Sequence, residues 1–319
     1  MKKLGIGIDL GGTKILGVLT NENGKVLKSI KEGTGNTNEG ERIISTIVAI
    51  IEKLKEGFKV KSVGIGCAGF IDYTNGVVHE SPNIKFLKNF PLGKTIYEKI
   101  KIPVFVDNDV KAGCVAEIYL GGGKNTKNFV YVTLGTGIGG CIVHDGKIVR
   151  GANNMAGEVG HITIDEFGPL CGCGKRGCVE ALASGLFIKN YFIHGVKRGI
   201  KTSVVEEIED IDKIDVPLIA KHARKGDLLS LKVLRTAAKN IGLMLSIIIN
   251  ILNPEKIIIG GGLLNAIDIV FEEMIETARL HSLKIPFESV KIEKSSVGEE
   301  GVAIGSSIMG ILRSEGMSI

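Results

Sequence analysis

The sequence predicts an α/β fold assembled from two similar halves. A strand, a glycine-rich turn, a second strand, an Asx-Gly hairpin turn and a third strand occur in this order at 4–30 and again at 128–149. Each half also contains apolar helical segments and further buried strands, an alternation typical of α/β proteins. Glycine accounts for 44 of the 319 residues, about twice its ordinary share of ~7%, without a collagen repeat. The sequence therefore predicts many tight loops, and its length favours two domains.

The first half is predicted from its apolar patterning. Isoleucine and leucine recur at spacings of three and four between residues 41 and 54, which predicts an amphipathic helix that ends at Gly57. Asn23-Gly24 marks a hairpin turn. The expected elements are strands at 4–9, 15–20, 25–30, 60–67 and 104–106, and helices at 41–54 and 111–120.

The second half repeats the opening meander and adds a helical region. Residues 185–238 are mostly helical and charged in pattern, and they carry no motif with assignable chemistry. We expect a smaller N-terminal domain, 1–112 with the C-terminal helix of about 303–319, and a larger domain, 113–302. The expected elements are strands at 128–134, 141–143, 147–149 and 256–259, and helices at 237–250 and 303–312.

Composition and charge exclude several classes of function. Lysine and arginine total 40 against 35 acidic residues, and a net charge of +5 indicates neither a nucleic-acid nor a membrane partner. No apolar run approaches the ~18 residues that a membrane span needs. The Met1-Lys2-Lys3 start leads into a strand without a cleavage site, so we expect a cytoplasmic protein.

The first glycine turn, Asp9-Leu10-Gly11-Gly12-Thr13-Lys14, has the features of a phosphate loop. It lies between two apolar strands, and its backbone amides and the Thr13 hydroxyl can close around an anion that approaches where side chains are absent. A plain hairpin that uses glycine for positive φ is the alternative. Spacing alone does not decide between the two.

Two nucleotide-binding motifs are tested by what surrounds them. Gly135, Gly137 and Gly140 match the dinucleotide-binding pattern G-x-G-x-x-G, but 141–149 read as a hairpin where that fold needs a helix. Lys94-Thr95 resembles the end of a P-loop, yet the earlier glycine is replaced by Lys88, which excludes that motif. The Gly260-Gly261-Gly262 run after a buried strand admits a nucleotide or tightens a corner between a strand and a helix.

His161, Cys171, Cys173 and Cys178 predict a zinc site. One imidazole and three thiolates within eighteen residues are a donor set suited to tetrahedral zinc, and the glycines between them allow tight turns. Four protein ligands leave no open position, so this zinc is expected to be structural. The alternative is a chance cluster of free cysteines.

Acidic residues gather at two places. Asp107, Asn108 and Asp109 lie where a strand gives way to a helix, and a helix N-cap accounts for one acid but not both, so the other is a candidate general base. Glu158 and Glu180 flank the zinc cluster and suit the recognition of hydroxyl groups. Solvated surface acids are the alternative for each.

Taken in order, four motifs resemble the ROK family of repressors and sugar kinases, and most of all its bacterial glucokinases. The resemblance runs from about Leu4 to Leu312. It implies the actin-like ATPase fold (ribonuclease H-like and duplicated), with two α/β domains flanking a cleft, and phosphorylation of glucose at the 6-hydroxyl by magnesium ATP. The motifs are Asp9-Leu10-Gly11-Gly12-Thr13, Leu134-Gly135-Thr136-Gly137-Ile138-Gly139-Gly140, Gly157-Glu158-Val159-Gly160-His161, and the Cys171 to Glu180 segment.

The resemblance also implies roles for individual residues. Asp109 is similar to the family's catalytic base. Ala68 departs from the proline of many relatives, and the tryptophan common after the Pro-Asn pair is missing, with Phe86 or Leu87 nearby. Both departures concern the sugar side. The implied sugar ligands are Gly69, Asn83, Asn108, Asp109, Glu158, His161 and Glu180, and the implied ATP-binding residues are Asp9, Gly11, Gly12, Thr13, Lys14, Thr136, Gly137, Gly261 and Gly262.

Two other functions compete with glucose phosphorylation. A kinase for mannose, fructose or an N-acetylhexosamine would retain every motif. A sugar-sensing transcription factor of the family would carry a helix-turn-helix before the first strand, and only three residues precede Leu4. The expected partners are the sugar and ATP, with no nucleic acid and no membrane, and we expect a homo-oligomer, either a dimer or a tetramer.

Overall fold

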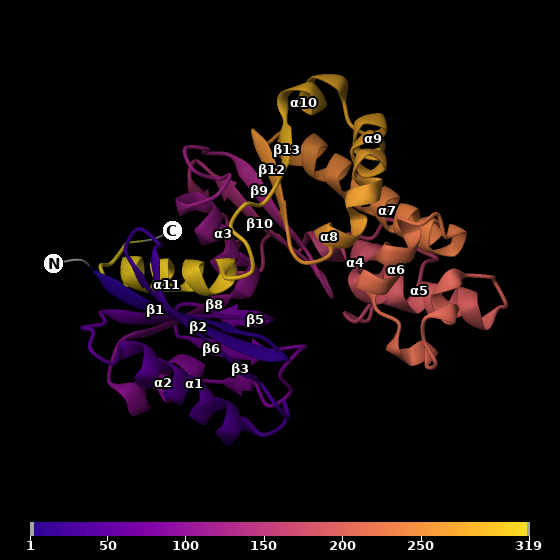
Figure 1. Cartoon of the computed structure of the whole chain (residues 1–319). Coiled ribbons are helices and arrows are strands. Elements are labelled where there is room, and N and C mark those ends of the chain that lie inside the picture. Colours follow the sequence, from indigo (N-terminus) through magenta and orange to yellow (C-terminus); the bar gives the residue numbers. More distant parts are fainter. Residues whose placement is uncertain (1–2, 318–319) are drawn as a thin grey trace. The chain divides into compact units, whose positions relative to one another are not determined.

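Two mixed five-stranded sheets of the same strand order form the frame of the protein. The computed structural model describes residues 3–317. The sheets run β3-β2-β1-β4-β8 and β11-β10-β9-β12-β13 (Figure 1). If the strands of each sheet are numbered in chain order, both sheets have the spatial order 3-2-1-4-5. The repeated meander of the sequence therefore belongs to a duplicated fold.

The first sheet combines an antiparallel meander with parallel strands. β1 pairs with β2 antiparallel and with β4 parallel, while β3 and β8 form the edges. Helices α1 and α2 face it, and a small sheet β5-β6-β7 lies between β4 and α2 in the chain. The elements are β1 (Leu4–Leu10), β2 (Lys14–Asn21), β3 (Val26–Gly33), α1 (Gly40–Lys55), β4 (Ser62–Cys67), β5 (Phe70–Asp72), β6 (Val77–Glu80), β7 (Lys88–Phe90), α2 (Leu92–Ile100), β8 (Val104–Asn108) and α3 (Asp109–Tyr119).

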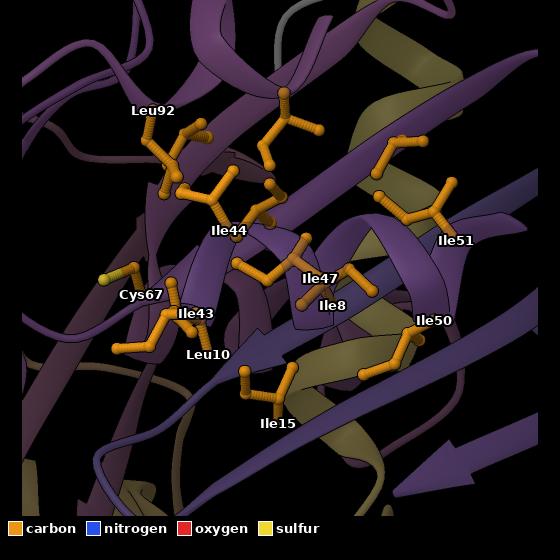
Figure 2. Close-up of a cluster of buried hydrophobic side chains, with 14 of the residues drawn as sticks. Ile8, Leu10, Ile15, Ile43, Ile44, Ile47, Ile50, Ile51, Cys67 and Leu92 are labelled. Atoms are coloured by element: carbon orange, nitrogen blue, oxygen red, sulfur yellow. The ribbon is translucent and has the colours of Figure 1, made fainter. Parts of the chain in front are cut away.

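An isoleucine-rich core joins α1 to the first sheet. Figure 2 shows Ile8, Leu10 and Ile15 from the sheet meeting Ile43 and Ile47 of α1. All five side chains are at most 1% exposed. Burial of a side chain of this size contributes roughly 1.5–3 kcal/mol. This core fixes the sheet whose strand ends carry the first glycine turn.

The last helix, α11 (Gly301–Arg313), packs on the opposite face of the same sheet. A Cβ added at Gly7 would lie 1.7 Å from the carbonyl oxygen of Ala303, and one at Gly64 would lie 1.8 Å from that of Ser306. Glycine at these strand positions therefore lets the helix backbone approach the sheet directly. In Figure 1, α11 is yellow and lies against indigo β1.

The second sheet is accompanied by a helical region. Its longest helix, α7, is the one helix among the described residues that is long and apolar enough to cross a membrane, but Val233, Leu234, Ile241 and Leu245 are fully buried core residues. The elements are β9 (Phe129–Leu134), β10 (Ile138–His144), β11 (Lys147–Ile148), α4 (Val179–Ala183), α5 (Gly185–Lys197), α6 (Val216–Ala223), α7 (Leu228–Leu252), β12 (Lys256–Gly260), α8 (Leu264–Ile267), α9 (Phe271–His281), α10 (Lys284–Ser289) and β13 (Lys291–Lys294).

Several local features differ from the expectations, and α2, α8, α9, α10 and β13 were not among the predicted elements. β10 begins at Ile138 rather than at residue 141, because pairing to a neighbouring strand supports Gly139 and Gly140 in extended conformation. The small sheet β5-β6-β7 was not predicted, because strands of three or four residues show little alternation. α7 begins nine residues before the expected position, where Asp227 caps it by accepting from the Ser230 amide.

The chain divides into two compact units. Unit 1 comprises 1–131, 141–157 and 295–319, and unit 2 comprises 132–140 and 158–294. The domain boundaries expected from the sequence, 1–112 with 303–319 and 113–302, stay a prediction.

Candidate functional site

The first glycine turn is a compact loop closed by its own backbone. The Gly11 amide donates to the carbonyl oxygen of Lys14 at 3.0 Å, which brings the ends of β1 and β2 together. Thr34, the residue after β3, braces the loop, because its hydroxyl donates to the Gly11 carbonyl at 2.7 Å and its amide donates to the Thr13 carbonyl at 3.1 Å. The Thr13 side chain remains exposed. The loop therefore has a fixed shape with an open mouth, as an anion cradle requires.

Two carboxylates lie close together beside this loop. Burial first, and then the neighbouring negative charge of Asp109, raise the pKa of Asp9 to about 6, with Lys14 opposing the shift. Lys14 is itself drawn toward Glu299, at 3.7 Å. The site thus holds more negative than positive charge at neutral pH. A bound cation would relieve this imbalance.

The end of β8 assigns a different task to each of its three polar residues. Asn108 caps α3, because its side-chain oxygen accepts from the amides of Val110 and Lys111. Asp107 is 1% exposed and pairs with Arg150 at 2.8 Å. Asp109 accepts from the Val110 amide at 3.0 Å, which orients its carboxylate. The capping residue is therefore an amide and not an acid, in contrast to the sequence expectation.

Gly69 and Asn83 adjoin the same group of residues. Asn108 donates from its side-chain amide to the Gly69 carbonyl at 3.2 Å. Gly69 has φ of 122°, and a Cβ there would lie 2.0 Å from the Glu80 carbonyl oxygen, so a larger residue is excluded. A Cβ added at Gly12 would lie 3.1 Å from the Cβ of Asn83. The fold of unit 1 therefore brings together the loop, Asp109 and three predicted sugar ligands.

The second glycine turn follows β9 and is held by a carboxylate. The Gly135 amide donates to the Gly137 carbonyl at 2.9 Å, and the Ile138 amide donates to Oε2 of Glu180 at 2.9 Å. A Cβ at Gly137 would lie 2.5 Å from that same Glu180 oxygen. Thr136 is exposed at the tip. Glu180 is thus a support of this turn, a role that the sequence did not indicate.

Gly261 lies against the strand that leads into the second turn. Its φ is 95°, and a Cβ there would lie 2.1 Å from the Leu134 carbonyl oxygen. The Leu263 amide also donates to that oxygen, at 3.0 Å. Gly262 is exposed and a Cβ there would meet nothing within 4 Å. Of the two predicted nucleotide contacts, the backbone therefore requires glycine at Gly261, whereas it leaves room for a Cβ at Gly262.

The His161 and cysteine cluster has the dimensions of a zinc site. The four ligand atoms, Nδ1 or Nε2 of His161 and the three sulfurs, all lie within 4.8 Å of one another. Cys173 and Cys178 place their sulfurs 3.7 Å apart, and Cys171 Sγ lies 3.7 Å from His161 Nδ1. Tetrahedral zinc with Zn–S bonds of ~2.3 Å requires ligand separations of about this size. The four predicted ligands fit the ion.

The zinc cluster connects to both neighbouring acids through short segments. Cys171 Sγ lies 3.8 Å from Oε1 of Glu180, whose other oxygen holds the second turn. Glu158 accepts from the His161 amide through its backbone carbonyl, at 3.1 Å. Gly160 permits close packing here, since a Cβ would lie 2.1 Å from the Ile138 carbonyl oxygen. Loss of the cluster would therefore disturb Glu158, Glu180 and the turn together.

The structure groups the predicted site residues within each unit and adds others that sequence analysis did not identify. Asp9 to Lys14, Gly69, Asn83, Asn108 and Asp109 belong to unit 1, while Thr136, Gly137, Glu158, His161, Glu180, the cysteines, Gly261 and Gly262 belong to unit 2. Sequence analysis missed Thr34, Arg150 and Asn154. Asn154 donates to the Ile71 carbonyl at 3.0 Å and lies 3.4 Å from Asp107. These are contacts between distant segments, and no spacing in the sequence signals them.

Comparison with known proteins assigns the family. The ROK family sequence profile matches residues 5–311. The chain belongs to the ROK family. It is 35% identical over 271 residues to the glucokinase of Thermotoga maritima, covering 85% of this chain and 86% of that protein. It is also 30% identical over 305 residues to the xylose repressor of Caldicellulosiruptor bescii, covering 94% of this chain and 76% of the repressor.

A solved ROK structure extends this likeness to three dimensions. The ROK family glucokinase from Streptomyces griseus, crystallised in complex with glucose and AMPPNP, superposes with a TM-score of 0.85. The two are 30% identical, with coverage of 96% of this chain and 99% of that one. The fold of this ROK protein is thus the actin-like ATPase fold, as the sequence resemblance implied.

Proposed function

We propose that this ROK protein is an ATP-dependent hexose kinase that phosphorylates glucose at the 6-hydroxyl, giving glucose 6-phosphate and ADP. The observation that carries the proposal is the position of Asp109 beside the Gly11–Thr13 loop, where it raises the pKa of Asp9. A proton acceptor next to a phosphate-sized loop is the pairing that phosphoryl transfer to an alcohol requires. The likeness to a glucokinase crystallised with glucose and an ATP analogue supports it.

Asp109 is proposed as the general base. Its carboxylate accepts the proton of the sugar 6-hydroxyl as the hydroxyl oxygen bonds to the terminal phosphorus, and the bond from that phosphorus to the bridging oxygen of ADP breaks. The hydrogen bond from the Val110 amide holds the carboxylate in one orientation. Asn108, which bonds the Gly69 carbonyl, is proposed to position the sugar beside it, together with Gly69 and Asn83.

Both glycine turns are proposed to bind ATP. The amides of Gly11 and Gly12 and the Thr13 hydroxyl would donate to phosphate oxygens, as would Thr136 and Gly137, and Gly261 and Gly262 would border the nucleotide. The paired charges of Asp9 and Asp109 fit a site for a magnesium–phosphate group, with Asp9 the residue that would hold it and Lys14 near the phosphates. Bound magnesium would supply neutralisation of phosphate charge.

The zinc cluster is proposed to shape the sugar pocket and to take no part in the chemistry. Cys171, Cys173, Cys178 and His161 would fill the coordination of a structural zinc. Its effect would be to hold Glu158, His161 and Glu180 as acceptors for neighbouring sugar hydroxyls. An acetamido group at carbon 2 would leave one such acceptor unpaired, and buried sites that expect a hydroxyl reject such analogues strongly.

A coupled ADP-release assay over a panel of sugars tests the proposal. At saturating magnesium ATP, glucose should give the highest kcat/KM among glucose, 2-deoxyglucose, mannose, fructose and N-acetylglucosamine. An N-acetylated sugar that outperforms glucose would contradict the pocket assignment and leave the kinase standing. A better rate with mannose or fructose would name a different hexose.

A sugar-sensing regulator is the second candidate, and the likeness to the C. bescii xylose repressor favours it. A regulator would bind sugar without turning over ATP, so calorimetric sugar binding with no ADP release for any sugar would identify this function. For the kinase we further propose a cytoplasmic homo-oligomer, a dimer or a tetramer. Light scattering at assay concentration measures that state.

A further inference from the structure

A cavity lies in unit 1, formed by residues that have no part in the proposed kinase site. It has a volume of about 340 Å³, within the ~300–1,000 Å³ range of small-molecule sites. Its wall includes Tyr73, Asn75, Lys94, Tyr97 and Arg313. Among the described residues that line it, Lys94 and Arg313 are basic and none is acidic.

Arg313, the last residue of α11, is held in this wall by aromatic rings and not by hydrogen bonds. Its guanidinium lies 4.8 Å from the centre of the Phe105 ring and 5.2 Å from that of Tyr73. Its Nη1 is inaccessible to solvent and has no hydrogen-bond partner among the described residues. An unpartnered buried donor is unfavourable, because its lost hydration is not replaced by a hydrogen bond. Turning the guanidinium toward the cavity would break no bond at Nη1 and would give this donor a partner in a bound acceptor.

The charges around the cavity leave an excess of positive charge. The guanidinium groups of Arg150 and Arg313 lie 3.9 and 5.2 Å from the centre of the Tyr73 ring. Asp107 is paired with Arg150 at 2.8 Å, so the charge of Arg150 is balanced. Burial lowers the pKa of Arg313 while Asp107 raises it, and a guanidinium stays protonated throughout the physiological range. Lys94 adds a further positive charge at the mouth, with Glu98 at 3.9 Å as its partner. A bound anion would neutralise the excess positive charge.

We propose that this cavity binds a phosphate monoester of a small polyhydroxylated molecule. Arg313 and Lys94 would hold the phosphate, since a guanidinium fork matches phosphate geometry. Asn75 and the Tyr97 and Tyr73 rings would contact the hydroxylated body. The Tyr73 ring also contacts Arg150, whose partner Asp107 lies two residues before Asp109. A ligand on Tyr73 would therefore be connected through these contacts to the strand end that carries the proposed base. The inference is independent of the proposed kinase activity.

Titration calorimetry on the full chain tests this site with glycerol 3-phosphate, glucose 6-phosphate, inorganic phosphate and glycerol. Both monoesters should bind, inorganic phosphate at least ~3-fold more weakly, and glycerol not at all. Tyrosine emission gives a local signal, because the chain has no tryptophan and two of its five tyrosines line the cavity. Absence of monoester binding at concentrations up to about 10 mM would overturn the proposal, as would equal affinity for inorganic phosphate.

Variants locate the binding. Arg313→Met should weaken glycerol 3-phosphate binding at least ~10-fold, and Arg313→Lys should weaken it less, because charge is kept and the fork is lost. Lys94→Glu, at a side chain that is 75% exposed, should weaken binding about 5-fold without endangering the fold. The matched control is Arg42→Met, on an exposed side chain of α1 in the same unit. Unchanged affinity in folded Arg313→Met and in Lys94→Glu would place the phosphate elsewhere, and the cavity would then have no such ligand.

Discussion

The two glycine turns of this ROK protein share one backbone design and differ in what surrounds it. Each is a three-residue break between two strands, Gly11–Thr13 and Gly135–Gly137, and in each the first glycine amide closes the turn with a backbone hydrogen bond. The first turn lies beside two carboxylates, Asp9 and Asp109, and burial together with the charge of Asp109 raises the pKa of Asp9 to about 6. The second is tied through Glu180 to a cysteine cluster. A similar backbone turn thus occurs twice, with a pair of carboxylates beside the first and the cysteine cluster beside the second. In the proposed function, the first difference assigns the chemistry and the second assigns metal-dependent support.

Asp109→Asn should have the largest effect, because it removes the proposed proton acceptor beside the first turn. We expect kcat to fall at least ~100-fold while sugar binding by calorimetry changes little. Asp145→Asn, on an exposed hairpin, is the matched control. Near-normal turnover in the Asp109 variant would show that Asp109 is not the proton acceptor, and the first turn would then have no chemical role that the second lacks.

Cys171→Ser should disturb the second turn through the metal. Zinc content, expected at about one per chain, should fall, and KM for the sugar should rise about 10- to 100-fold, since the cluster holds Glu158 and Glu180. Cys141→Ser is the control at a buried cysteine outside the cluster. Mass spectrometry under native conditions and steady-state kinetics measure the two effects. A metal-free variant with ordinary kinetics would show that the second turn stands without zinc.

Asp9→Asn should change how stability depends on pH. The folded pKa of Asp9, about 6, exceeds its usual 3.8, so its contribution to stability is present below pH 3.8 and is lost as pH rises through 6. Ionised Asp9 therefore costs about 2–3 kcal/mol near pH 8 in the protein without ligands. Asp9→Asn should gain that amount in urea unfolding at pH 8 and almost none below pH 4. An equal gain in the free energy of unfolding at pH 8 and below pH 4 would mean that ionisation of Asp9 does not destabilise the folded protein.

Gly261→Ala should have the smallest of the four effects and separates the two nucleotide-side glycines. Its φ of 95° and the 2.1 Å approach to Leu134 should cost about 1–3 kcal/mol in thermal unfolding and raise KM for ATP a few-fold. Gly262→Ala, where a Cβ would meet nothing within 4 Å, is the matched partner and should unfold like the unaltered protein. Similar losses in both would trace the effect to glycine itself and not to the contact with Leu134.

Local chemistry was enough to predict many of the longer elements and the zinc ligand cluster. The spacing of Ile43, Ile47 and Ile50 placed the start of α1 to within one residue and its end to within two, because one apolar stripe at helical period has only one face to bury. The four zinc ligands lie within eighteen residues of chain, so short glycine turns suffice to gather them. Strands of three residues such as β5 gave no such signal.

Tertiary structure decided which residues support the site. The residue pattern left Asp107 and Asp109 equivalent, and only the family resemblance singled out Asp109. The buried pair of Asp107 with Arg150, 43 residues later, gives a physical reason for the difference. The raised pKa of Asp9 likewise depends on Asp109, a hundred residues away, and the bond from Glu180 to Ile138 depends on two segments meeting in space. The sequence alone therefore determined many of the longer elements and the donor set of the cysteine cluster, because these follow from neighbours along the chain. Charge, orientation and support at the site were decided by the fold, because electrostatic and hydrogen-bond energies depend on distances that sequence separation does not set.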